Sequence, residues 1–160
     1  MDLFVIRHAP PLAHSTGGSE SGPPLSAEGR ERWIRCVSGL DALGVRLDRI
    51  LHSPLLRAAQ TAEELAKLLD GESLVSPGLA EPPTDALLAE AAGAQSVAFV
   101  GHEPYVGMLV SILLMPRKGP SLVLPFQKGT VAWLRGEPRP GGMQLVAFLP
   151  PGALSRVGVQ

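Results

Sequence analysis

Two short apolar runs constrain the fold of this 160-residue chain more than any other feature of its sequence. Residues 3–6 read Leu-Phe-Val-Ile, and residues 96–100 read Ser-Val-Ala-Phe-Val. Uninterrupted apolar runs of this length, with β-branched and aromatic side chains, are typical of strands buried on both faces of a parallel sheet. Because such a sheet is covered by helices on both sides, the two runs predict an α/β architecture.

Helical patterns lie between the strand patterns. Ser26 precedes an amphipathic stretch that should end at Gly44, because serine is a favoured N-cap and glycine a frequent helix terminator. Ser53 should cap a second helix with Pro54 in its first turn, and its apolar stripe continues to residues 70–71. The remaining predicted elements are a loop over 77–84, helices over 85–92 and from Pro104, and strands over 47–51, 131–134 and 144–149. The order β-α-β-α-α-β-α-β-β predicts a three-layer α/β/α sandwich with a mostly parallel central sheet.

Composition indicates one compact domain over residues 1–160 and excludes several kinds of partner. The chain is 45% hydrophobic, and its 14 basic and 15 acidic residues give a net charge of -1. This balance provides no basic excess for nucleic acid or an anionic membrane surface. Neither a signal-peptide pattern nor the roughly 18 apolar residues of a membrane helix is present. The single cysteine, Cys36, cannot form an intrachain disulfide, so we expect a cytoplasmic protein. Composition gives no reason to expect a stable oligomer, so we also expect a monomer.

Polar residues that suit catalysis follow both apolar runs. Arg7 and His8 come directly after the first run, and Gly101 and His102 follow the second. Because parallel strands place their sites beyond their carboxyl ends, the two histidines are expected to face one crevice. A lone histidine at a strand end often only binds a neighbouring carbonyl, and that interpretation stays open for each one by itself.

Arg57 is the third candidate. It falls in the first turn of the helix after Ser53, where a cation opposes the helix dipole, and local rules are broken most often at functional sites. An exposed arginine that reaches a surface acid is the alternative. Two guanidinium groups and two imidazoles, with no carboxylate cluster, predict an oxyanion pocket without metal or cofactor. A dianionic phosphoryl group fits such a pocket, and a neutral imidazole can attack phosphorus.

Four segments carry a resemblance to a known family. They are Phe-Val-Ile-Arg-His-Ala at 4–9, Pro-Leu-Ser-Ala-Glu-Gly at 24–29, His-Ser-Pro-Leu-Leu-Arg-Ala-Ala-Gln-Thr-Ala at 52–62 and Val-Gly-His-Glu-Pro at 100–104. In this order and spacing the sequence resembles the histidine phosphatase (phosphoglycerate mutase-like) superfamily, and within it the small bacterial phosphohistidine phosphatases of the SixA family. The segments span nearly the whole chain. The resemblance implies a phosphoglycerate mutase-like fold.

The resemblance also implies roles for the candidate residues. His8 would accept the phosphoryl group, Arg7, Arg57 and His102 would bind it, and water would release it. Ala9 departs from the glycine that is more usual in the superfamily, although the phosphohistidine subgroup tolerates a small alanine there. Leu-Ala-Glu at 79–81 resembles the start of a loop that carries the general acid in larger members. Glu81 is therefore a possible general acid, and a solvated loop residue is the alternative.

Three functions remain open at this level. The leading hypothesis is a phosphatase for phosphohistidine on a protein, because no large insertion is present that would roof the pocket. A phosphatase for small phosphomonoesters is the first alternative, and Glu81 would support it. A non-catalytic module that binds phosphate or a phosphoprotein is the second. We further expect residues 15–24 to form a mobile loop, and Lys128 to be a solvated surface charge.

Overall fold

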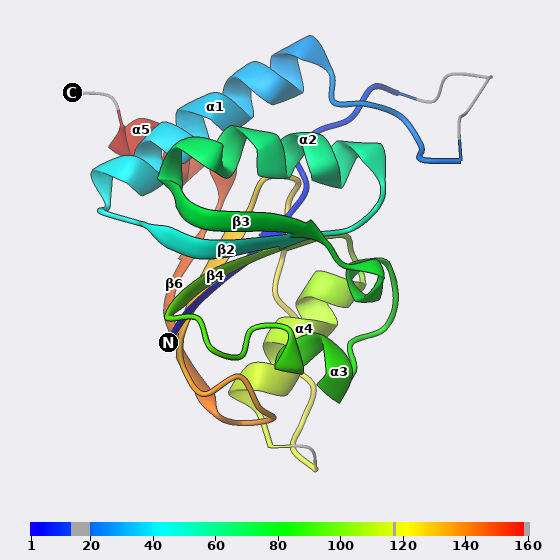
Figure 1. Ribbon diagram of the computed structural model, residues 1–160, viewed down its shortest axis with the longest axis vertical. Helices are drawn as coiled ribbons and strands as arrows, with labels where there is room; N and C mark the ends of the chain where they lie inside the picture. Colours follow the sequence, from blue (N-terminus) through cyan, green and yellow to red (C-terminus); the bar gives the residue numbers. More distant parts are fainter. Residues whose placement is uncertain (14–19, 117, 159–160) are drawn as a thin grey trace.

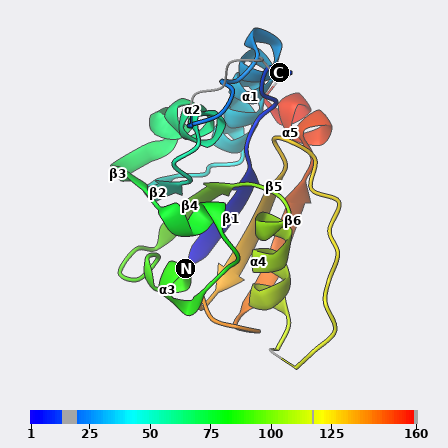
Figure 2. The same cartoon turned by 90° about the vertical axis from the view of Figure 1, so that its right-hand side faces the viewer.

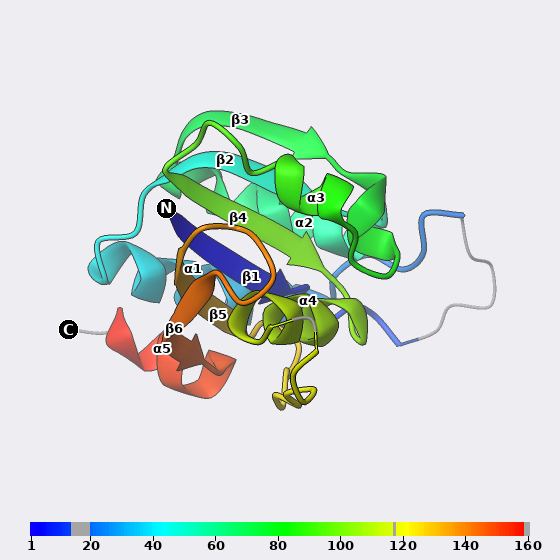
Figure 3. The same ribbon diagram turned by 90° about the horizontal axis from the view of Figure 1, so that it is seen from below.

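The computed structural model describes residues 1–13, 20–116 and 118–158 (Figure 1). Six strands form one sheet in the order β3-β2-β4-β1-β5-β6, which Figure 3 shows in succession. Three pairs of neighbouring strands are parallel: β3 with β2, β2 with β4, and β4 with β1. β5 is antiparallel to its two neighbours, β1 and β6. The strands are β1 Asp2–Arg7, β2 Leu47–His52, β3 Leu69–Val75, β4 Ser96–Gly101, β5 Val131–Gly136 and β6 Met143–Leu149. The predicted mostly parallel sheet is confirmed.

Helices cover both faces of the sheet, as the views in Figures 1 and 2 show. One face carries α1 Ala27–Ala42, α2 Leu56–Glu64 and α5 Pro151–Val157, and the other carries α3 Asp85–Ala89 and α4 Tyr105–Leu114. The sandwich therefore has three layers, as predicted. No helix within the described ranges is both long and apolar enough to cross a bilayer.

β1 is packed tightly because its side chains alternate between two apolar cores. Phe4 and Ile6 pack with α1 and α2, whereas Leu3 and Val5 pack with α3 and α4. All four are almost completely buried. Burial on both faces holds the strand rigidly, so its last residue, Arg7, and the next residue, His8, leave the core at a fixed position.

The sequence analysis was wrong about residues 65–75. The predicted long helix ends at Glu64, a short 3-10 helix covers Leu65–Leu68, and β3 covers Leu69–Val75. β3 pairs only with β2, and most of its residues are exposed. An edge strand does not have to bury a continuous apolar run, so β3 lacks the pattern that reveals β1 and β4.

Two other local differences concern α5 and Ser53. The prediction placed no element at α5, which begins with Pro151 and buries Leu154 against α1. Ser26 caps α1 as predicted, because its hydroxyl accepts a hydrogen bond from the Gly29 amide at 2.9 Å. Ser53 does not cap α2 in the predicted way, because the helix begins only at Leu56. Its hydroxyl lies 2.7 Å from His102 Nε2 instead.

Candidate active site

The parallel pairing of β1 and β4 brings the two predicted histidines together. Arg7 is the register partner of Gly101, and the His8 amide donates to the Gly101 carbonyl at 3.0 Å. The rings of His8 and His102 follow directly, with centroids 5.0 Å apart and planes inclined by 50°. Neighbouring parallel strands that end at the same level thus create a pair of adjacent imidazoles.

A cavity of about 560 Å³ lies at these strand ends, and we call it the phosphate cavity. Its lining includes the four predicted residues Arg7, His8, Arg57 and His102. The other lining residues in the described part of the chain are Pro11, Leu12, Ala13, Pro23, Glu103 and Lys128. His14 and residues 15–19 of the predicted mobile loop lie outside the described residues, so the mobility of that loop stays a prediction.

His8 is held as a neutral imidazole whose Nε2 keeps its lone pair. Its Nδ1 lies 2.7 Å from the Ala9 carbonyl oxygen, and because a carbonyl only accepts, Nδ1 carries the proton. Nε2 therefore keeps its lone pair, toward which Arg57 Nε donates at 3.3 Å. Burial lowers the pKa of His8 to about 3, and the positive charges around it, including Arg57 and Arg7, act in the same direction. His8 is consequently neutral at pH 7, with no proton on Nε2, and able to act as a nucleophile.

Thr61 fixes the position of His8 relative to Arg57. Its hydroxyl accepts a hydrogen bond from the Ala9 amide at 3.0 Å and donates to the Arg57 carbonyl at 2.7 Å. Thr61 is completely buried. The segment after β1 and the first turn of α2 are thereby joined by one side chain, which sets the distance between nucleophile and guanidinium.

The segment 126–130 holds Arg7 and His8 through the backbone. Arg7 Nη1 donates to the Phe126 carbonyl at 2.6 Å, and the Arg7 amide donates to the Thr130 carbonyl at 3.1 Å. The Gly129 amide donates to the carbonyls of both Arg7 and His8, each at 3.0 Å. The sequence analysis did not identify these contacts, since backbone hydrogen bonds require no particular side chain.

His102 and Arg7 each have a buried nitrogen that forms no hydrogen bond within the described part of the chain. His102 Nε2 pairs with Ser53 Oγ, whereas its Nδ1 and Arg7 Nε are buried with no hydrogen-bond partner among the described residues. Burial, together with the charges of Arg57 and Arg7, lowers the pKa of His102 to about 4. A buried polar nitrogen without a partner is costly, and such groups commonly serve a function. Both nitrogens belong to residues that line the phosphate cavity.

The carboxylate at the phosphate cavity is Glu103 rather than the predicted Glu81. Glu81 is exposed and borders a separate, very small hollow beside Leu79 and Tyr105. Glu103 lines the phosphate cavity, and its Oε2 accepts a hydrogen bond from the Gly107 amide at 3.3 Å. Sequence reasoning overlooked Glu103, although it directly follows His102. Lys128, interpreted from the sequence as a solvated charge, also lines the cavity while remaining exposed.

The donor set of the phosphate cavity suits an oxyanion. Arg7 and Arg57 supply planar, permanently charged donors that match the oxygens of a phosphoryl group. Within residues 1–13, 20–116 and 118–158, no three His, Cys, Asp or Glu side chains come together in a group that could hold a metal ion.

The family model of the histidine phosphatase superfamily (branch 1) matches residues 3–85. The chain belongs to this superfamily. It is 33% identical to the phosphohistidine phosphatase SixA of Escherichia coli over 123 residues, which cover 71% of this chain and 74% of that protein. An uncharacterized protein of Picosynechococcus sp. is 34% identical over 131 residues, 78% of this chain and 79% of that protein.

A solved structure supports the same assignment. The structure of the protein histidine phosphatase SixA complexed with tungstate superimposes with a TM-score of 0.78 and 28% sequence identity. The match covers 96% of this chain and 99% of that one. The predicted membership and similarity to SixA are therefore confirmed, and the chain is a phosphatase with the fold of this superfamily.

Proposed function

We propose that the chain hydrolyses phosphohistidine on a protein, through a covalent intermediate on His8. The observation that carries this proposal is the neutral His8, whose Nε2 lone pair faces Arg57 in the phosphate cavity. The similarity to SixA supports the substrate class. The tungstate in that SixA structure is an oxyanion like phosphate, which fits a cavity with two guanidinium groups.

The first chemical step transfers the phosphoryl group to His8. Arg7, Arg57 and His102 bind the phosphoryl oxygens, and Nε2 of His8 attacks phosphorus. The bond between phosphorus and the substrate imidazole breaks, and its electron pair stays with the departing nitrogen. The guanidinium groups stabilise the charge that spreads over the oxygens in the transition state. No proton is needed on the departing nitrogen when the other ring nitrogen already carries one.

The second step returns the enzyme to its starting state. Water attacks the phosphorus of phosphorylated His8, the bond from phosphorus to Nε2 breaks, and inorganic phosphate leaves. The proton lost by water passes to phosphate or solvent, and His8 is again neutral. The hydrogen bond from Nδ1 to the Ala9 carbonyl holds the ring in one orientation through both steps. The same hydrogen bond stabilises the positive charge on the ring of phosphorylated His8, as hydrogen bonds to Nδ1 do in other catalytic histidines.

An alcohol leaving group would need a proton donor, and Glu103 is placed better for that role than Glu81. Glu103 lines the phosphate cavity, whereas Glu81 does not. Hydrolysis of small phosphomonoesters is therefore the second candidate function, and Glu103 is the observation that favours it. A module that only binds phosphate is less consistent with the site, because binding does not require an unprotonated imidazole. We also propose that hydrolysis requires no metal ion and that the protein acts in the cytoplasm.

The test compares protein-borne phosphohistidine with a panel of phosphomonoesters, both with excess EDTA. A histidine phosphotransfer domain phosphorylated on its histidine should be dephosphorylated, and its kcat/KM should exceed that of every ester. Hydrolysis of the esters alone would reject the proposed substrate, and loss of activity in EDTA would reject metal independence.

Two matched carboxylate variants separate the candidates for proton transfer. Glu103→Gln should lower ester hydrolysis at least about tenfold, because general acid catalysis typically contributes more than that. The same variant should leave phosphohistidine hydrolysis within a few-fold of wild type. Glu81→Gln is the control and should change neither rate. A selective loss of ester hydrolysis in Glu81→Gln would reassign the acid to that residue.

A further inference from the structure

A groove of about 350 Å³ adjoins the phosphate cavity, and we call it the α4 groove. It lies between the first turns of α4 and the segment 121–124, and it is lined by Glu103, Gly107, Met108, Ser111, Leu122 and Val123 among others. Glu103 lines both the groove and the phosphate cavity, so the two hollows lie next to each other at this residue. A surface that covers the mouth of the cavity on this side also meets the groove.

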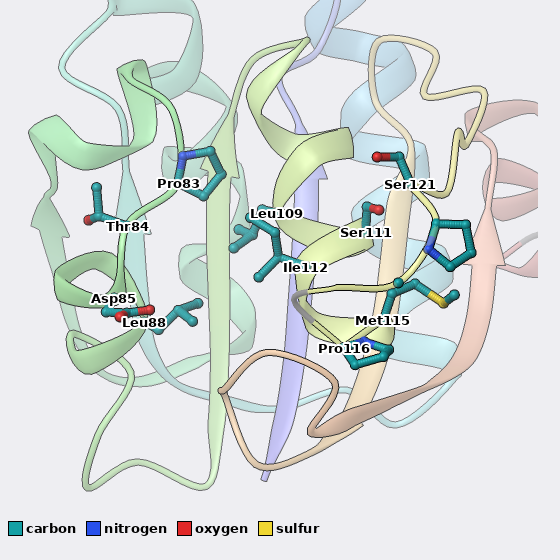
Figure 4. Close-up of a pocket in the computed structure, with 12 residues that line it drawn as sticks. Pro83, Thr84, Asp85, Leu88, Leu109, Ser111, Ile112, Met115, Pro116 and Ser121 are labelled. Atoms are coloured by element: carbon teal, nitrogen blue, oxygen red, sulfur yellow. The ribbon is translucent and has the colours of Figure 1, made fainter.

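A second hollow of about 440 Å³ continues the groove away from the cavity. The two share Ser111, Ile112 and Ser121. Figure 4 shows the residues that line this hollow, with Thr84 and Leu88 on one side and Ser111 and Ile112 of α4 on the other. A concave strip therefore follows α4 from Glu103 toward its carboxyl end.

The α4 groove is unusually apolar for a protein surface. α4 contains no charged residue between Tyr105 and Leu114, although part of the helix faces outward. Met108 is 43% exposed, Leu122 is 37% exposed and Val123 is 89% exposed. A helix without a charged face is normally covered on all sides, and contiguous exposed apolar side chains commonly mark a binding surface.

We propose that the α4 groove docks an apolar strip of the phosphoprotein whose phosphohistidine enters the phosphate cavity. This inference depends on the proposed function. A histidine side chain is short, so a phosphohistidine bound beside His8 brings its own backbone to the cavity mouth. The surface next to that backbone then lies over Glu103 and the groove that begins there. Free phosphohistidine, which has the same reacting bond, is too small to cover Met108 and Val123 as well.

The charges along the groove define the chemistry of the partner surface. Glu103 is the only charged residue that lines the groove within the described part of the chain. The partner strip should consequently be apolar, with a cationic group or a hydrogen-bond donor opposite Glu103. Affinity in such a contact comes mainly from a few buried apolar side chains. Met108 and Val123, the most exposed apolar side chains of the groove, are thus expected to provide most of it.

The experiment measures steady-state kinetics of Met108→Asp and Val123→Asp on two substrates. One is a phosphotransfer domain phosphorylated on histidine, and the other is free phosphohistidine. Both variants should raise the KM for the phosphoprotein about tenfold or more and leave its kcat unchanged. Kinetics on free phosphohistidine should stay at wild-type values, which also shows that the variants are folded. Val123 lies outside every helix and strand, so its variant tests docking even if Met108→Asp perturbs α4.

Ile34→Asp is the matched control. Ile34 is 43% exposed, like Met108, and lies on α1, which covers the opposite face of the sheet. Its KM for both substrates should equal that of wild type.

Equal KM values for Met108→Asp, Val123→Asp and Ile34→Asp on the phosphoprotein would overturn the docking surface but leave the proposed function intact. A wild-type protein that hydrolyses free phosphohistidine but not the phosphoprotein would overturn the proposed function itself. A change of oligomeric state in Val123→Asp would assign the groove to a second copy of this chain and overturn docking of the phosphoprotein.

Discussion

Two regions of the molecule build the phosphate cavity in opposite ways. The segments around Arg7, Arg57 and His102 supply side chains: Arg7 ends β1, His102 follows β4, and Arg57 lies in the first turn of α2, the helix after β2. The segment 126–130, which leads into the antiparallel strands, supplies mainly backbone groups that bind Arg7 and His8. The first region determines which chemistry is possible. The second determines how precisely the nucleophile is held, without any side-chain signature of its own.

Removing a side chain of the first region should have the largest effect. Arg57→Ala should lower kcat about 10²- to 10³-fold, because a donor to the developing charge of the transition state is lost. Arg57→Lys should recover only part of that loss, since an ammonium group retains the charge without the planar fork. Steady-state kinetics on a phosphohistidine protein measure both effects.

Arg30→Ala is the control for Arg57. Arg30 pairs with Glu63 of α2 at 2.9 Å, in an exposed ion pair away from the cavity. Its removal should leave kcat unchanged, because exposed ion pairs contribute little even to stability. A comparable loss of activity in both variants would mean that the integrity of α2, and not the Arg57 guanidinium, is what matters.

Changing the backbone region should have a smaller effect on activity. Gly129 has a φ of +84°, so Gly129→Ala should cost about 1–2 kcal/mol of stability and displace the amide that binds Arg7 and His8. A displacement of well under 1 Å near the nucleophile should lower kcat about tenfold. Chemical denaturation and kinetics on the same preparation separate the two effects.

Gly44 provides the matching variant in an open location. Its φ is +77°, and a Cβ there would meet no atom within 4 Å. Gly44→Ala should lose a similar amount of stability and keep full kcat. If Gly129→Ala and Gly44→Ala both lost stability but neither lost activity, segment 126–130 would have no role in holding the nucleophile.

A prediction that leaves activity at neutral pH untouched concerns stability in acid. The pKa values of His8 and His102 are lowered in the folded state, so the unfolded chain binds more protons between about pH 6.5 and pH 4. Stability should accordingly fall as the pH drops below about 6.5, and it should level off once the folded-state pKa values are passed. Between about pH 7 and pH 5 the loss should be on the order of 1–2 kcal/mol for each histidine. Urea unfolding of wild type and His8→Gln measures it, and an unchanged pH slope in His8→Gln would contradict a buried neutral His8.

The central strands and the four cavity residues could be predicted from the sequence because burial leaves a pattern. β1 and β4 are buried on both faces and read as apolar runs, and the polar residues after them necessarily meet at one edge. β3 could not be recognised, because an edge strand with exposed side chains has no comparable constraint. Its first residues, 69–71, were instead predicted as the end of a helix, and residues 72–75 were assigned to no element.

The remaining parts of the site leave no readable signal. Gly129 binds Arg7 and His8 through its backbone amide, and every residue except proline has such a donor. Glu103 lies directly after His102, and nothing in the sequence distinguishes a cavity carboxylate at this position from an exposed surface acid. The two carboxylates Glu81 and Glu103 differ in their position relative to the cavity, and tertiary structure alone provides that information.

Phosphoryl transfer to His8 is tested most directly by trapping the intermediate. Enzyme in excess is mixed rapidly with the phosphohistidine protein, quenched under denaturing alkaline conditions that preserve phosphohistidine, and examined by peptide mass spectrometry. One phosphoryl group should appear on His8 before inorganic phosphate accumulates, and His8→Ala should neither carry it nor turn over substrate. Release of phosphate without a phosphoryl group on His8, or its appearance on His102 instead, would contradict the account.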